Sequence, residues 1–154
     1  MFPLLPHDKH ESLCRRCGMS CHSPILLGAR TVIISELRCR FLAYDSEAKA
    51  LCTVYENRYE AAPWCKSAEE AFTMNGLAHD CPYTAGIDSY RGKRWATAKE
   101  HEAIVPVLLA KLVAEGLTTE HNPDAALPLL ERDGSRWTYE QSEDGSRFLF
   151  RRIH

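Results

Sequence analysis

The chain has 154 residues, of which 45% are hydrophobic and 26% are charged, and its formal net charge is −2. This length is enough for one domain that buries roughly two thirds of its unfolded surface. The slightly acidic balance, with a pI near 6.4, excludes an overall positive field that would draw the protein onto nucleic acid or anionic lipid.

No targeting or membrane-spanning segment is expected. The apolar stretch Met1–Pro6 is broken by proline and is followed at once by charged residues, which does not fit a signal peptide. The longest apolar run, Ile104–Ala110, falls far short of the roughly 20 residues that a transmembrane helix needs. We therefore expect a cytoplasmic protein without membrane contact.

Cysteine spacing is the most informative feature of the sequence. Three thiols fall within eight residues, and four more follow; the seven are Cys14, Cys17, Cys21, Cys39, Cys52, Cys65 and Cys81. Thiolates two residues apart can bind one zinc or iron ion from a single turn. Gly18, directly after Cys17, suits a tight knuckle because glycine accepts a positive φ. Disulfides are disfavoured in a reducing cytoplasm, so the pattern predicts a metal site, although an outlying thiol such as Cys52 also fits a buried small hydrophobe.

The region before the charged segment Asp88–Arg94 carries all the cysteines, and residues 1–90 are predicted to form the metal-binding part. Its expected strands are Thr31–Ile34, Arg40–Tyr44 and Ala50–Tyr55, with a hairpin between the last two that brings Cys39 and Cys52 toward the knuckle. Ser67 and Glu70 form a capping box for a short helix that ends near Gly76 and returns His79 and Cys81 to the start of the domain.

Residues 91–154 are predicted to form a helix and a C-terminal β-hairpin packed on the first part, within one compact domain. Thr97 and Glu100 make a second capping box, Gly116 is the expected helix end, and Pro106 kinks or restarts the helix. A short helix follows from Asn122 to Leu130. The strands Arg136–Glu140 and Arg147–Arg151 then alternate across an Asp-Gly turn, with their aromatic residues on one face. The fold class is small irregular α+β.

The cysteine pattern resembles the YkgJ/YcgN-type cysteine-cluster family. The match runs over residues 11–84, through the segments Glu11–Gly18, Cys39–Leu42, Cys52–Arg58, Cys65 and Cys81–Tyr83. The resemblance implies a zinc- or iron-chelating domain without an agreed reaction. Two positions depart from the family pattern, because Ser20 stands where a cysteine doublet would begin and Tyr59 stands where proline is common.

Several metal arrangements fit the seven thiols. Two tetrahedral zinc ions that share one bridging thiolate need seven sulfur ligands, which is the favoured arrangement. The alternatives are a four-cysteine site beside a three-cysteine site completed by His22 or His79, and a [4Fe–4S] cluster with three spare thiols. The other histidines, among them His101 and His121, lie in polar sequence and are expected at the surface.

The favoured function is a non-catalytic zinc-binding (or iron-binding) protein that presents a surface to a protein partner. No catalytic residue is assigned, because the sequence lacks phosphate-binding, metalloprotease and nucleophile-elbow motifs. Two alternatives stay open: a metal-dependent enzyme, since the resembled family includes flagellin lysine methylases, and a zinc-dependent nucleic-acid module that uses Arg91, Lys93 and Arg94.

Overall fold

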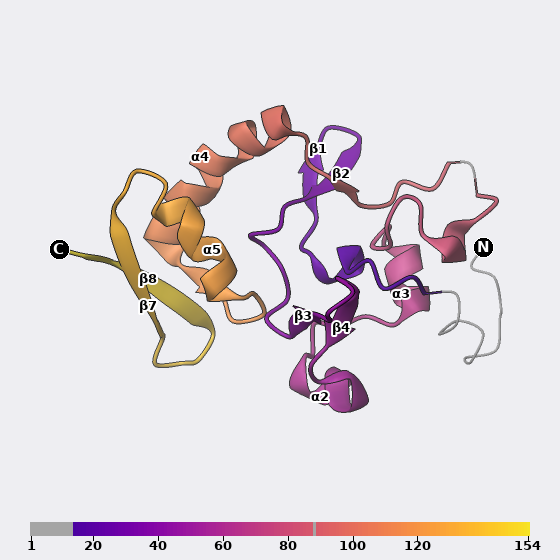
Figure 1. The fold of residues 1–154 in the computed structure, drawn as a ribbon, viewed down its shortest axis with the longest axis horizontal. Helices are drawn as coiled ribbons and strands as arrows, with labels where there is room; N and C mark the ends of the chain where they lie inside the picture. Colours follow the sequence, from indigo (N-terminus) through magenta and orange to yellow (C-terminus); the bar gives the residue numbers. More distant parts are fainter. Residues whose placement is uncertain (1–13, 88) are drawn as a thin grey trace. The chain divides into compact units, whose positions relative to one another are not determined.

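The computed structural model describes residues 14–87 and 89–154; the N-terminal segments considered above and Asp88 lie outside this range. The chain forms two compact units, each with helices and short strands, which makes the fold class α+β as predicted (Figure 1). Unit 1 takes the chain up to Ile33 and then Phe41–Trp95, and unit 2 takes Ile34–Arg40 and Ala96–His154. The segment that carries Cys39 therefore belongs to unit 2.

Unit 1 holds two small sheets. In the first, β2 (Arg30–Ile33) pairs antiparallel with β1 (Ile25–Leu27) and parallel with β5 (Arg94–Trp95). The second is a hairpin of β3 (Leu42–Tyr44) and β4 (Ala50–Cys52), in which Leu42 lies opposite Cys52. The hairpin was predicted, but it does not contain Cys39, because β3 begins three residues later and Cys39 forms a bridge with His121 of unit 2.

The helices of unit 1 are all short. They are the 3₁₀ helices η1 (Met19–Cys21), η2 (Tyr55–Asn57) and η3 (Pro82–Thr84) and the α-helices α2 (Arg58–Ala61) and α3 (Ala68–Thr73). The predicted capping box of α3 is present: Glu70 N–H donates to the Ser67 hydroxyl, and the Ser67 N–H donates to the Glu70 carboxylate. Since short helices bury little apolar area, tertiary contacts must hold these segments in place.

Unit 1 is closed by a backbone contact between two distant segments. Lys93 N–H donates to Leu77 O at 2.8 Å, and His79 N–H donates to Lys93 O at 3.0 Å. The adjoining Gly92 has no room for a side chain: a Cβ there would lie 2.5 Å from Leu77 O and 2.6 Å from His79 N. The chain therefore needs glycine at this position because two backbones touch.

We expect Gly92→Ala to lower the free energy of unfolding of unit 1 by about 1–3 kcal/mol, the usual cost of forcing extra atoms into a packed site. Backbone atoms cannot rotate away as a side chain could. Gly86→Ala is the comparison variant, because its site opens into free space and its only cost is the strain of a side chain at a φ of +86°, whereas Gly92 has no positive φ and its cost comes from the contact. Urea unfolding of both variants checks this, and wild-type stability in Gly92→Ala would contradict the contact argument.

Unit 2 is built on the long helix α4 (Ala98–Glu115), which begins with the predicted Thr97–Glu100 capping box. Pro106 lies inside it without ending it, and the N–H of Gly116 donates to Leu112 O at the C-terminus. Helix α5 (Pro123–Leu130) and a three-stranded sheet complete the unit. The sheet has the order β6 (Leu117–Thr118), β8 (Arg147–Ile153), β7 (Arg136–Gln141), and every neighbouring pair is antiparallel.

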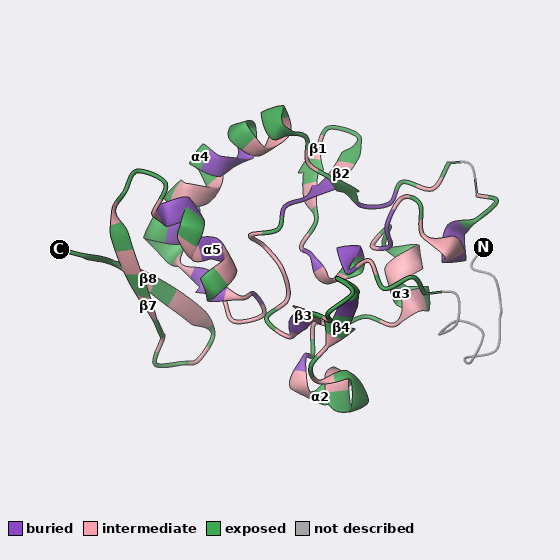
Figure 2. Ribbon diagram, in the orientation of Figure 1, coloured by how far each residue is buried: buried purple, intermediate pink, exposed green. Residues whose placement is uncertain are grey.

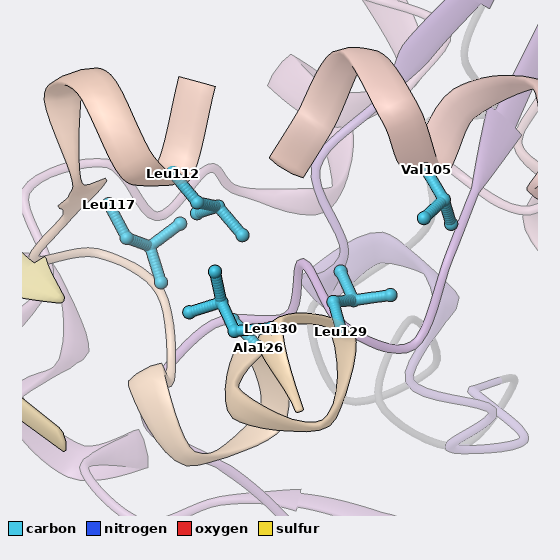
Figure 3. Close-up of a cluster of buried hydrophobic side chains, with 6 residues drawn as sticks. All are labelled: Val105, Leu112, Leu117, Ala126, Leu129 and Leu130. Atoms are coloured by element: carbon cyan, nitrogen blue, oxygen red, sulfur yellow. The ribbon is translucent and has the colours of Figure 1, made fainter. Parts of the chain in front are cut away.

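The core of unit 2 lies where α4 and α5 meet. Figure 3 shows the side chains of the two helices pointing into the space between them; the cluster is Val105, Leu112, Leu117, Ala126, Leu129 and Leu130. The aromatic face of the β7–β8 hairpin packs on it through Trp137, Phe148 and Phe150, as the alternation of the strands predicted. Figure 2 shows α4 as mostly exposed or half-buried, and its buried residues are Ile104, Val105 and Leu112.

Leu112→Ala is expected to destabilise unit 2 by about 2–5 kcal/mol, because Leu112 is only 1% exposed and its removal leaves a cavity. Val113→Ala on the same helix is the control, since Val113 is 56% exposed and its loss should cost under about 0.5 kcal/mol. Thermal unfolding followed by far-UV circular dichroism compares the two. Similar midpoints would show that α4 does not pack through the Leu112 face.

Candidate metal centre

The cysteine knuckle, residues 14–21, is shaped by Gly18. Its φ is +77°, and the N–H of Cys21 donates to Gly18 O at 3.1 Å to close the turn. A Cβ at this position would lie 3.0 Å from the Cβ of Ala50 and 3.2 Å from the Tyr44 hydroxyl. The predicted need for glycine is confirmed, and it has a second cause: the knuckle packs directly against the β3–β4 hairpin.

Backbone and side-chain hydrogen bonds fix the knuckle to the hairpin. Ala50 N–H donates to Arg16 O at 2.8 Å, and Arg16 Nε donates back to Ala50 O at 2.7 Å. The Arg16 guanidinium also reaches Asp45 in the hairpin loop at 3.0 Å. The CxxC motif is therefore held by a preformed surface and is not a loose loop.

Two thiols of the knuckle lie within electrostatic reach of Cys81, and we call Cys14, Cys17 and Cys81 the thiol cluster. Cys17 and Cys81 both pack against the small core of Met19, Ile33 and Ala78. Burial raises the pKa of the Cys81 thiol, and negative charge on Cys17 and Cys14 would raise it further, which places the three groups within electrostatic reach. The sequence predicted that the segment ending at Cys81 returns to the knuckle, and in the structure it does.

An ion pair borders the thiol cluster. The Arg15 guanidinium binds the Asp80 carboxylate and also hydrogen-bonds Cys17, which raises the pKa of Arg15 and keeps that of Asp80 below its usual range. His79 Nε2 lies 3.8 Å from the same carboxylate. Since Arg15 and Asp80 are both partly exposed, the pair contributes little to stability, about 0–1 kcal/mol. Its effect is to position a positive charge beside the Cys17 sulfur.

At the other end of the knuckle, Cys21 lies near a buried cation. Lys93 is 5% exposed, and its ammonium donates to Ser20 O at 3.1 Å and to His22 O at 2.6 Å. Burial lowers the pKa of Lys93 to about 8, and negative charge on Cys21 opposes that shift. Lys93 therefore adds no charge to the surface, which weakens the alternative of a nucleic-acid module that uses Arg91, Lys93 and Arg94.

Of the two candidate histidine ligands, His79 lies near the Asp80 carboxylate at 3.8 Å, whereas His22 lies inside unit 1. His22 is buried; its Nδ1 lies 2.8 Å from Gly18 O, and its ring meets Trp95 edge-on at 4.9 Å. A neutral His22 that donates from Nδ1 leaves Nε2 in the form that binds metals. The expectation that His121 lies at the surface is wrong, because it is buried in unit 2 against Thr118.

The remaining cysteines are placed by other contacts. Cys52 is the last residue of β4, and Cys65 follows α2, where its N–H donates to Ala62 O and its thiol lies within electrostatic reach of Arg58. Cys39 belongs to unit 2, where its backbone forms an isolated β-bridge with His121. The structure thus groups Cys14, Cys17 and Cys81, places Cys21 beside Lys93, and positions Cys39, Cys52 and Cys65 through separate segments.

The present side-chain arrangement does not form a finished metal site. Over residues 14–87 and 89–154, no group of three or more His, Cys, Asp or Glu side chains is placed so that it could hold an ion. The seven cysteines all lie in this range, and none of them forms a disulfide. Metal coordination would therefore require the thiols to move closer together than they are here.

Three charged residues at this site were not predicted to be part of it: Arg15 and Asp80, which form an ion pair, and Lys93. Arg15 and Asp80 each adjoin a cysteine, which was an available signal for their position. Lys93 lies within a basic run, and only the missing side chain of Gly92 indicated a close backbone contact there.

No family model matches this chain, and comparison with curated proteins and with solved structures finds no significant match. The resemblance to the cysteine-cluster family therefore stays a prediction. Within the part of the chain that the structure describes, no helix is long and apolar enough to cross a membrane.

The different exposure of the clustered thiols can be tested by alkylation. In the reduced, metal-free protein at about pH 7.5, we expect iodoacetamide to label Cys14 at least about tenfold faster than Cys81, because Cys14 is exposed, whereas Cys81 is partly buried and its pKa is raised. Raising the pH through 9 should speed labelling of Cys81, since the thiolate is the reactive form. Peptide mapping by mass spectrometry gives both rates, and equal rates at about pH 7.5 would contradict this arrangement.

Proposed function

We propose that this protein is a non-catalytic metal-binding protein that holds zinc through cysteine thiolates and presents its folded surface to a protein partner. One observation carries the proposal: Cys81, which is distant in sequence from the knuckle, packs with Cys17 on the apolar core around Met19 and lies within electrostatic reach of Cys14. Three thiols that already lie near one another lose less conformational entropy on binding an ion than thiols scattered over the surface.

The chemistry of the group favours a soft metal ion. Cysteine sulfur binds zinc, iron and copper(I) in preference to magnesium or calcium, and zinc with cysteine alone forms closed structural sites. The thiols must lose their protons when the metal binds, so binding releases protons and becomes weaker in acid. Iron, alone or in a [4Fe–4S] cluster, is the alternative occupant of the same residues.

The site is not preformed, and the proposal includes this feature. Metal binding would draw a fourth ligand, such as Cys21 or Cys52, toward the thiol cluster and stabilise unit 1 as it does so. Structural zinc supplies an apparent binding free energy of about 10 kcal/mol in small domains, which is enough to offset a local rearrangement. Unit 2 has its own apolar core, so we expect it to fold without the metal.

The test is metal analysis of Cys17→Ser beside the wild-type chain, both purified without oxygen. We expect the wild type to carry about one to two equivalents of zinc and Cys17→Ser to lose at least half of them, because a serine hydroxyl is a poor ligand for zinc. Ser20→Ala is the matched control, since it removes a hydroxyl from the same knuckle but no thiol. Cys39→Ser, run in parallel, decides whether the cysteine in unit 2 is also a ligand.

The metal content of the wild type identifies the metal ion, and the content of the variant tests the thiol cluster. A colourless protein with zinc supports the closed thiolate site, and a coloured protein with iron assigns the cluster instead. A wild-type chain that neither carries zinc or iron nor binds them on titration would refute the metal-binding function. Unchanged metal content in Cys17→Ser would refute the role of the thiol cluster.

A further inference from the structure

Lys93 is a buried charged group, although its contacts with the knuckle carbonyls need only a hydrogen-bond donor and not a positive charge. Its side chain lies within the protein, and its ammonium contacts the carbonyl oxygens of Ser20 and His22. Removing an ammonium from water costs several kcal/mol, and two neutral carbonyl groups recover only part of that cost. An aliphatic side chain of similar length would fill the same space without this penalty, so the retained charge calls for a reason.

The charge is directed at one cysteine of the knuckle. The two carbonyl acceptors belong to the residues on either side of Cys21, and negative charge on Cys21 is what favours the ammonium form of Lys93. An ammonium has three N–H donors, and two are used by the carbonyls. Cys21 lies in the chain between the two carbonyl acceptors, so the ammonium is held beside the residue whose sulfur would carry negative charge when bound to a metal ion.

The backbone of Lys93 is tied to the other end of the thiol cluster. Its N–H and C=O pair with Leu77 and His79, a short distance along the chain from Cys81. One residue therefore holds the return segment with its backbone and the knuckle with its side chain. A change of side chain at position 93 therefore acts on the knuckle, while the backbone pairing with the return segment is kept.

We propose that Lys93 is the positioning residue and positive counter-charge of the cysteine site, so that zinc affinity depends on a cation at this position. The inference rests on the proposed metal-binding function. A zinc ion with four thiolates carries a net charge of about −2, and a buried cation beside it stabilises the loaded state. Residues outside the coordination shell commonly change metal affinity by about 10–100-fold when removed.

The experiment measures zinc affinity of the full chain by competition with a chromophoric chelator, for the wild type, Lys93→Met, Lys93→Gln and Lys93→Arg. We expect Lys93→Met and Lys93→Gln to bind zinc at least about tenfold more weakly and Lys93→Arg to stay within about threefold of the wild type. Arg94→Met is the matched control, because it removes an exposed charge from the next residue and should change nothing.

The pair Lys93→Gln and Lys93→Arg separates charge from structure. Both side chains can donate hydrogen bonds to the knuckle carbonyls, but only arginine is charged. Wild-type affinity in Lys93→Gln would overturn the proposal, as would equal weakening in Lys93→Gln and Lys93→Arg, which indicates a purely structural contact. If Lys93→Met fails to fold, this pair still decides. Absence of zinc binding by the wild type is a different result, which refutes the proposed function and, with it, this role of Lys93.

Discussion

The pairing of Gly92 and Lys93 with residues 77–79 is the contact on which unit 1 depends. It joins the last strand of the unit to the segment that precedes Cys81, and the absence of a side chain at Gly92 is what lets the two backbones meet. From the same position, the Lys93 ammonium holds the carbonyl groups of the knuckle. Because the helices of unit 1 are short, few other contacts could keep these three segments together.

Most local elements could be predicted from the sequence, because their causes are local. The capping boxes at Ser67 and Thr97 place the starts of α3 and α4, and strict alternation with an Asp-Gly turn predicts the β7–β8 hairpin. For Pro106, the sequence left open whether the helix is kinked or restarts at this residue. The helix continues through it, since buried contacts at Val105 and Leu112 on either side hold both halves on one core.

Long-range pairing could not be predicted, for a physical reason. The parallel contact of β2 with β5 involves strands of only a few residues, too short to show a period, and its partners are far apart in the chain. The same holds for the bridge between Cys39 and His121, which takes that cysteine into unit 2. Cysteine spacing alone carries no information on which unit a thiol joins, so the expectation of one converging set of seven was more than the pattern could specify.

The charged groups at the candidate site were misjudged because sequence gives type but not burial. A run of Arg, Gly, Lys and Arg is typical of a solvated turn, yet one of its cations lies inside the protein, where its neighbours are carbonyl oxygens and a thiol. Protonated thiols pack as small apolar groups, which is how Cys17 and Cys81 sit against Ile33. Once the thiols are deprotonated, the two thiolates repel each other and are stabilised by nearby positive charge. The buried ammonium of Lys93 and the Arg15 guanidinium lie at opposite ends of the knuckle, beside cysteines whose sulfurs would carry this charge if they bound the proposed metal ion.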